Sequence, residues 1–211
     1  MPLYRCMIRT GTRLVAVSLI LAGVFFVGKF AVISFLQATS QTAQEQQWQK
    51  LMQAAEGPST AANSVPAVGN GGTATDTGFG GSVYLKLTVE KLSKNGIAVD
   101  GDWNNLHSAT MVHYHDSPAP GQPGNVLIAF HRENHWNDIN QVGAGDYVQV
   151  QTADGRIYRY LVDFVHIVRP SETDLLQPTR DGNRYLTLIT CDPVWQDYNR
   201  MIFRLHLVQT A

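Results

Sequence analysis

Residues 185–191 read YLTLITC, and residues 200–208 read RMIFRLHLV. Both runs are rich in the β-branched and aromatic side chains that favour strands. Between them, Asp192-Pro193 end the first run, because proline cannot donate to a central sheet ladder. The two runs are therefore predicted to be strands, with Cys191 at a strand end that opens into a loop.

The chain from about Gly81 onward consists of similar short strand-like runs separated by turn signals. Ala153-Asp154-Gly155 separates two of them and is a hairpin signal. No convincing long helix interrupts the series, so seven or eight strands predict an all-β closed barrel or a sandwich over 81–211. The other predicted strands cover residues 83–89, 97–101, 125–131, 147–152, 156–162 and 164–168.

A long apolar run, residues 14–36, contains 23 residues and a single charge at Lys29. A helix of this length reaches about 34 Å, enough to cross a hydrocarbon core of about 30 Å. Three arginines and no acid precede it, so residues 1–13 are predicted to be cytosolic and the rest extracytoplasmic, as in a single-pass protein of the cell membrane. Two alternatives remain: a cleaved signal peptide ending near Ala38-Thr39-Ser40, and a buried helix of a soluble protein.

The stretch over 37–80 is predicted to connect this segment to the strand-rich domain. Residues 41–55 are good helix formers with Trp48, Leu51 and Met52 at helical spacing, which predicts a short amphipathic helix. Residues 57–80 are dominated by Gly, Pro, Ser and Thr and are predicted to be a flexible linker. The predicted order is a basic cytosolic end (1–13), a signal-anchor (14–36), helix plus linker (37–80) and a catalytic domain (81–211).

Charge and cysteine content exclude several classes of protein. Only 16% of residues are charged and 44% are hydrophobic, which excludes full disorder and fibrous repeats. The domain over 81–211 has 11 basic against 14 acidic residues, a net charge of −3, which argues against a nucleic-acid partner. Cys6 and Cys191 are too few for a disulfide scaffold. If residues 14–36 span a membrane, Cys191 is the one exported thiol, either a reactive group or an inert buried side chain.

Two further residues fit nucleophilic chemistry at Cys191. His131 ends an apolar run, and a thiol with a pKa of about 8.5 needs such an imidazole because little thiolate exists at neutral pH. Arg200 begins the last run, on the face opposite Met201 and Phe203, where a guanidinium can hold a substrate carbonyl or a developing oxyanion. Arg204 shares this face, but we expect the loss of Arg200, and not of Arg204, to remove activity.

The sequence around these residues resembles that of a known protein family. Thr187-Leu188-Ile189-Thr190-Cys191 resembles the TLxTC signature of sortases, and the Arg-x-Ile-Phe of residues 200–203 resembles the arginine strand that follows it. GQPGNVLIAFHR, residues 121–132, resembles the loop and strand that lead to the family's histidine, and GDYVQVQT resembles its GD-x-V strand. The resemblance runs over roughly 83–208 and is nearest to the class D and E types. One departure is Phe130, where sortases usually have glycine before the histidine.

The resemblance implies a closed eight-stranded β-barrel and a membrane-anchored cysteine transpeptidase at the cell surface. Cys191 is then the nucleophile, His131 the acid and base, and Arg200 the oxyanion group; Thr190, His113 and Tyr114 are expected to contact substrate. The implied partners are surface proteins with an LPxTG-like sorting signal, and the implied acceptor is an amine of a cell-wall precursor or a pilin. No cofactor is implied.

Three other functions remain open. His131-x-x-x-His135, or His113 with His115, can bind zinc if the geometry allows, although Arg132 stands where a metalloprotease motif has glutamate. A cysteine endopeptidase with water as acceptor uses the same residues. An inactive anchored binding module uses none of them.

Overall fold

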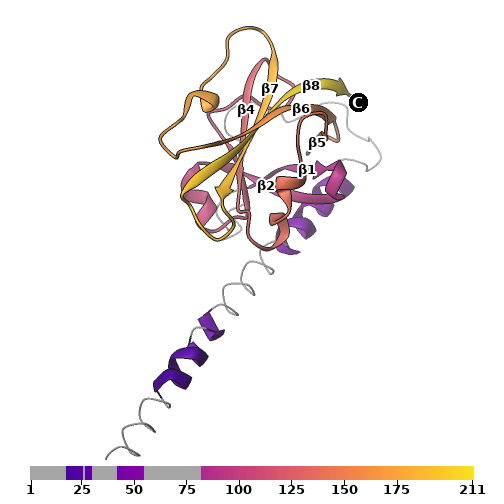
Figure 1. Cartoon of the computed structure of the whole chain (residues 1–211). Helices are drawn as coiled ribbons and strands as arrows, with labels where there is room; N and C mark the ends of the chain where they lie inside the picture. Colours follow the sequence, from indigo (N-terminus) through magenta and orange to yellow (C-terminus); the bar gives the residue numbers. More distant parts are fainter. Residues whose placement is uncertain (1–17, 26, 30–41, 55–81) are drawn as a thin grey trace, which may run out of the picture. The chain divides into compact units, whose positions relative to one another are not determined.

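In the computed structural model of the protein, the described residues are 18–25, 27–29, 42–54 and 82–211. Eight strands form one closed barrel in the order β1-β2-β3-β4-β7-β8-β6-β5 (Figure 1). Two neighbouring pairs, β2 with β3 and β4 with β7, are parallel, and the other pairs are antiparallel. The barrel is therefore mixed. Its closed order of eight strands confirms the predicted fold. The strands are β1 Val83–Val89, β2 Lys94–Gly101, β3 Met111–Tyr114, β4 Gly124–Phe130, β5 Tyr147–Thr152, β6 Ile157–Val168, β7 Arg184–Asp192 and β8 Asn199–Thr210.

The number of strands agrees with the sequence-based count, although one strand was predicted as two and another was not predicted. Residues 156–162 and 164–168, predicted as two strands, are the single strand β6, because a register shift at Asp163 lets the pairing with β8 continue. Strand β3 was not among the predicted runs; it has only four residues, and its histidine and tyrosine weaken the apolar signal. The predicted hairpin joins β5 to β6, with Gly155 at φ +84° in its turn.

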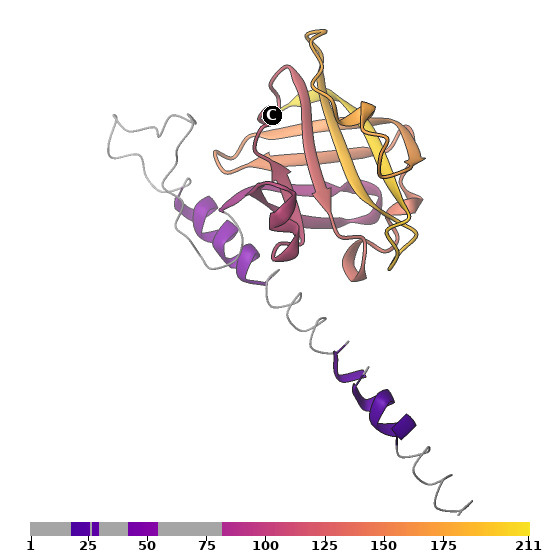
Figure 2. The ribbon, with the colours of Figure 1, turned by 90° about the vertical axis from the view of Figure 1, so that its left-hand side faces the viewer.

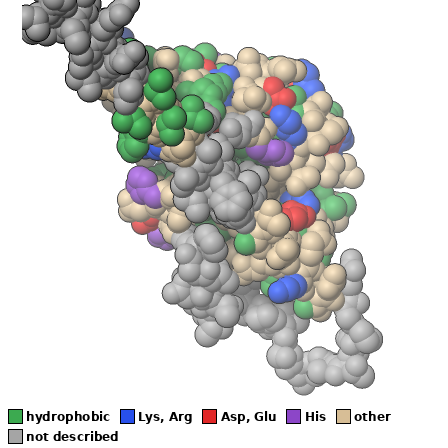
Figure 3. All heavy atoms as spheres, turned by 90° about the horizontal axis from the view of Figure 1, so that it is seen from below, with side chains coloured by type: hydrophobic (Ala, Val, Ile, Leu, Met, Phe, Trp, Pro, Cys, Tyr) green, Lys and Arg blue, Asp and Glu red, His purple; other side chains and the backbone are tan. Residues whose placement is uncertain are grey.

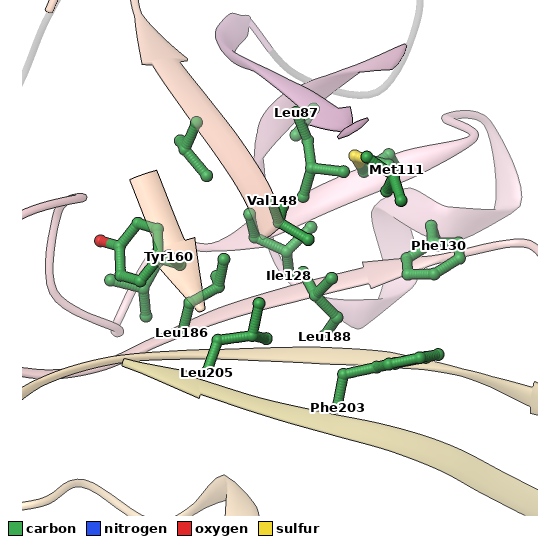
Figure 4. Close-up of a cluster of buried hydrophobic side chains, with 14 of the residues drawn as sticks. Leu87, Met111, Ile128, Phe130, Val148, Tyr160, Leu186, Leu188, Phe203 and Leu205 are labelled. Carbon is green, nitrogen blue, oxygen red and sulfur yellow. The ribbon is translucent and has the colours of Figure 1, made fainter. Parts of the chain in front are cut away.

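Alternation along the strands fills the barrel interior with apolar side chains (Figure 4). Phe203 and Leu205 of β8 point inward together with Leu186 and Leu188 of β7, and Met201 of β8 belongs to the same buried cluster. Each such side chain contributes roughly 1.5–3 kcal/mol through its burial. Residues of opposite parity on β7 and β8 consequently lie on the outer face of the barrel, where the candidate site is built.

A helix over 42–54 belongs to the same compact unit as the barrel. Its Trp48 is 2% exposed and packs with Val83 of β1 and Ile97 of β2. Met52 is partly buried against the same cluster, whereas Leu51 is 37% exposed. The apolar side of the helix thus covers the outer surface of β1 and β2.

The amino-terminal unit is described only in part. Residues 18–25 and 27–29 are helical, and their side chains are exposed. The rest of the predicted signal-anchor over 14–36 and the predicted linker over 57–80 lie outside the described residues. Among the helices that the structure does describe, none is both long enough and apolar enough to traverse a membrane.

Charged side chains of both signs are interspersed over the molecular surface, as the face in Figure 3 shows. Several of them form ion pairs between elements. Lys91 pairs with Asp146 at 2.9 Å, and Arg159 of β6 pairs with Glu90 at 2.7 Å. Exposed pairs of this kind contribute little to stability, typically below about 1 kcal/mol.

Candidate active site

A cavity of about 350 Å³ opens on the outer face of the barrel, over the ends of three neighbouring strands. His131, Cys191 and Arg200 all line it. Further walls come from the 3-10 turn η2 (Trp103–His107) and from the long loop between β6 and β7, drawn in orange in Figures 1 and 2. The complete lining is Trp103, Leu106, Ala129, Phe130, His131, Pro170, Glu172, Leu176, Ile189, Thr190, Cys191, Arg200 and Ile202.

Strand register brings the three predicted residues together. Cys191 of β7 is the direct cross-strand partner of Arg200 in β8. On the other side of β7, Ala129 of β4 pairs with Ile189 in parallel register, and His131 and Cys191 each lie two residues further along. A strand of alternating parity presents such residues on one face. The sheet alone therefore places the imidazole, the thiol and the guanidinium in a row.

His131 is held by a hydrogen bond through one of its two ring nitrogens. Its Nε2 donates to the carbonyl oxygen of Leu106 at 2.7 Å. Its Nδ1 lies 3.7 Å from Oε2 of Glu133. Because a carbonyl only accepts, Nε2 carries a proton, and Nδ1 is the nitrogen with a free role in proton exchange.

Arg200 is anchored by the loop between β7 and β8. Its Nη1 donates to the carbonyl oxygens of Asp197 at 2.9 Å and Asn199 at 3.0 Å. Its Nε and Nη2 have no hydrogen-bond acceptor among the described residues, so their N–H groups are available to an oxygen in the cavity. The side chain is oriented by backbone carbonyls, and no carboxylate of the described residues pairs with it.

Cys191 is a free, partly buried thiol. Burial raises the pKa of this thiol, the positive charge of Arg200 lowers it, and the negative charges of Glu133 and Asp197 raise it. Burial is the largest of these effects, so the pKa lies above its usual range and the resting sulfur is mainly protonated. A base beside it is needed to release the nucleophile.

The sequence and fold of this domain match one family. The family model of the sortase domain matches residues 87–208, more than half of the chain. The chain belongs to the sortase family. Sortases are cysteine transpeptidases, which agrees with a cavity built around a thiol.

Individual relatives are more distant. Sortase SrtE1 of Streptomyces coelicolor is 31% identical over 88 residues, which are 37% of this chain and 25% of the relative, so the chain matches about a quarter of that protein's length. Sortase E of Streptomyces avermitilis is 25% identical with a TM-score of 0.54, over 63% of this chain and 91% of that one. Sortase D5 of Clostridium perfringens is 18% identical with a TM-score of 0.58, over 82% and 99%, and shows the fold alone. The likeness is to the family and not to one class.

Of the three residues predicted to contact substrate, only Thr190 lines the cavity. Thr190 lines the cavity, but its hydroxyl donates to the carbonyl oxygen of Phe130 at 2.8 Å and so ties β7 to β4. His113 does not line the cavity: it is buried, its Nδ1 is 2.7 Å from Asp100, and its ring stacks on Tyr84. It points away because β3 turns that side chain toward β2 and not toward β4's outer face.

Tyr114 does not line the cavity but contacts a residue that does. Its ring stacks on Trp103 with 4.8 Å between the ring centres, and Trp103 does line the cavity. Phe130, the departure from the family pattern, points into the core beside Trp136 with ring centres 5.5 Å apart. Its bulk is accommodated by the interior of the barrel.

Two features of the site were missed in the sequence. Arg132 and Asp192, which follow His131 and Cys191 in the chain, form an ion pair whose side chains are 6% and 17% exposed. Glu133 contributes the carboxylate beside His131. The only sequence signal was that opposite charges follow both catalytic candidates, and charge alone does not show which residues meet.

The alternative zinc sites are not assembled. Residues 131–135 are not helical, apart from the start of the short turn η3 (Asn134–Trp136), and Nε2 of His135 contacts the carbonyl oxygen of Asn95 at 2.8 Å. Nδ1 of His115 contacts the carbonyl oxygen of Gly101 at 2.9 Å. Within the described ranges, no group of three His, Cys, Asp or Glu side chains is arranged to hold a metal ion.

Proposed function

We propose that this sortase cleaves an LPxTG-like sorting signal at its Thr–Gly amide and transfers the acyl part to an amino group of a cell-wall precursor or a pilin. The observation that carries the proposal is the row of His131, Cys191 and Arg200 on adjoining strands at one cavity. A thiol, an acid–base group and a cation at the acyl oxygen are the three requirements of thioester chemistry.

In the first half-reaction, Sγ of Cys191 attacks the amide carbon and a thioester forms. The thiol proton passes to His131 and then to the departing amine as the C–N bond breaks. Arg200 donates hydrogen bonds to the oxygen that becomes negative in the tetrahedral intermediate. In the second half-reaction the acceptor amine attacks the thioester, the C–S bond breaks, and the proton of the amine returns through His131 to the sulfur.

The proposal includes anchoring by residues 14–36, with residues 1–13 in the cytosol and the catalytic domain outside. The apolar run of 23 residues with one charge, preceded by three arginines, supports it. In a membrane fraction, the full chain should sediment with the lipid, and a chain lacking residues 1–36 should not. Sedimentation of both would place the attachment elsewhere.

The deciding experiment is mass spectrometry of the full-length chain incubated with an LPxTG-type peptide, with and without an amine such as triglycine. We expect an acyl adduct on Cys191 that the amine discharges to a ligated product. The Cys191→Ala variant should give neither adduct nor product, whereas the matched Cys6→Ala variant should behave as wild type.

Each outcome distinguishes a function. Release of the acid alone in the presence of amine would identify a cysteine endopeptidase with water as acceptor. Cleavage by Cys191→Ala would remove the thiol from the mechanism. Absence of any adduct across a panel of sorting-signal peptides would favour an inactive binding module.

A further inference from the structure

Behind the cavity, three buried polar side chains meet on the outer face of the sheet. They are Asn125 of β4, Thr187 of β7 and Arg204 of β8, which are 2%, 0% and 9% exposed. Cys191 and Arg200 lie elsewhere on β7 and β8, and His131 directly follows β4. Buried polar groups are costly unless they are hydrogen-bonded, so the partners of these three residues, here called the polar cluster, define its role.

The amide of Asn125 is the centre of the polar cluster. Its Oδ1 accepts from Thr187 Oγ1 at 2.7 Å and from Arg204 Nη1 at 2.8 Å. Its Nδ2 donates to the carbonyl oxygens of Leu175 at 3.0 Å and Gln177 at 3.3 Å. Two accepted and two donated bonds use the whole capacity of an amide and fix its orientation.

Besides its bond to Asn125, Arg204 donates one hydrogen bond directly to the loop between β6 and β7. Its Nη2 donates to the carbonyl oxygen of Leu175 at 3.1 Å, and its guanidinium lies 5.0 Å from the centre of the Tyr185 ring. Within the described part of the chain no carboxylate lies at ion-pair distance from it. The buried positive charge is thus stabilised by two neutral oxygens, Oδ1 of Asn125 in the sheet and the carbonyl oxygen of Leu175 in the loop.

The loop held in this way is the one that forms a wall of the cavity. Leu175 and Gln177 flank Leu176, which lines the cavity, and Pro170 and Glu172 of the same loop line it as well. The short turn η5 (Asp174–Leu176) is therefore fastened to the barrel on both sides of its cavity-lining residue. Moving η5 would move that wall.

We propose that Asn125, Thr187 and Arg204 are positioning residues that set the distance between the β6–β7 wall and Cys191, and thereby the affinity for the acyl-donor peptide. The inference rests on the proposed function for the identity of the ligand. It revises the expectation that Arg204 is dispensable, because the alternation of β8 places Arg204 on the site's face but does not reveal the loop above it.

The test compares Arg204→Met with Arg159→Met in the full-length chain. Arg159 pairs with Glu90 and contacts neither the loop nor the cavity, so it controls for loss of an arginine. For Arg204→Met we expect KM for a sorting-signal peptide to rise about tenfold while kcat changes less than about threefold, since binding and not chemistry is lost. Amide hydrogen exchange over residues 170–178 should accelerate by about tenfold. Alkylation of Cys191 by iodoacetamide should keep its wild-type rate.

Conservative variants separate positioning from general destabilisation. Arg204→Lys should recover only part of the affinity, because one ammonium cannot donate to Asn125 and Leu175 in the geometry of a guanidinium fork. The double variant of Arg204→Met with Asn125→Leu should be no worse than either alone, since both remove one network. If Arg204→Met fails to fold, Thr187→Val, which removes a single hydroxyl, should show a smaller rise in KM with the same exchange pattern.

Unchanged exchange over residues 170–178, or a fall in kcat at constant KM, would overturn the inference. Failure of the wild-type chain to process any sorting-signal peptide would count against the proposed function and not against the polar cluster. In that case hydrogen exchange alone decides whether the cluster holds the wall.

Discussion

The Cys191 thiol titrates under opposing influences that the structure identifies one by one. Burial raises its pKa most strongly, and the carboxylates of Glu133 and Asp197 raise it further, while Arg200 acts in the opposite direction. An up-shifted thiol is protonated at neutral pH. In the proposed mechanism His131 is then needed as the base that generates the thiolate.

At this scale we predict the pH dependence of thiol alkylation. Because the neutral form predominates below the pKa, the rate with iodoacetamide should rise with pH and reach its midpoint above the usual value of about 8.5. Arg200→Gln removes the charge that favours thiolate and should move the midpoint up. Glu133→Gln removes a charge that opposes it and should move the midpoint down.

Arg184→Gln serves as the matched control for Arg200→Gln. Arg184 is an exposed arginine at the beginning of β7, the strand that ends at the site. Its loss should leave the midpoint where it is. A midpoint insensitive to Arg200 and Glu133 alike would contradict the assignment of these charges to the site.

At the scale of elements, the ends of β4 and β7 are fastened to each other beside His131 and Cys191. The Arg132–Asp192 ion pair joins the residue after His131 to the residue after Cys191, and the Thr190 hydroxyl bonds the Phe130 carbonyl just before it. Parallel strands have slanted hydrogen bonds and pair slightly less stably per residue than antiparallel strands. These side-chain contacts extend the connection past the last ladder pair, Ala129 with Ile189, to the level of His131 and Cys191.

We predict that Arg132→Met lowers the free energy of unfolding by about 2 kcal/mol, because it leaves the partly buried carboxylate of Asp192 without its partner. The kcat/KM of peptide cleavage should fall about 100-fold as the imidazole and the thiol lose their alignment. Urea unfolding and peptide cleavage measure the two effects.

The double variant of Arg132→Met with Asp192→Leu provides the control. Removing both charges eliminates the unpaired carboxylate, so most of the lost stability should return while activity stays low. A double variant as unstable as the single one would show that the pair acts through packing and not through charge.

At the scale of the whole molecule, the barrel is closed, and the helix over 42–54 covers part of its outer surface over β1 and β2. None of the residues that line the cavity belongs to this helix. Trp48 is its main contact, packed on β1 and β2. Substitutions in this helix are consequently expected to change the stability of the fold without changing catalysis.

We predict that Trp48→Ala lowers the free energy of unfolding by about 3 kcal/mol through the cavity it leaves, with kcat/KM unchanged. Leu51→Ala, on the exposed side of the same helix, should change stability by no more than about 0.5 kcal/mol. Urea unfolding of the two variants is the measurement. Equal effects would mean that Trp48 does not anchor the helix.

The sequence by itself determined the strand-rich domain and its site to the level of residue type. Apolar alternation is local, so Val83–Val89 and Tyr147–Thr152 could be read to the residue, and the inward face of β8 followed from parity alone. The TLxTC motif, the histidine after an apolar run and the arginine on the last strand likewise stand in the chain as short patterns, and the structure gathers them at one cavity.

Only the tertiary structure decided which distant residues meet. The parallel pairing of β4 with β7, the ion pair of Arg132 with Asp192, the burial of His113 against Asp100 and the attachment of Leu175 to Arg204 all join segments whose contact depends on barrel closure. Side-chain alternation has the same period in every strand, so it fixes which face a residue occupies. It carries no information on which strand or loop lies opposite that face.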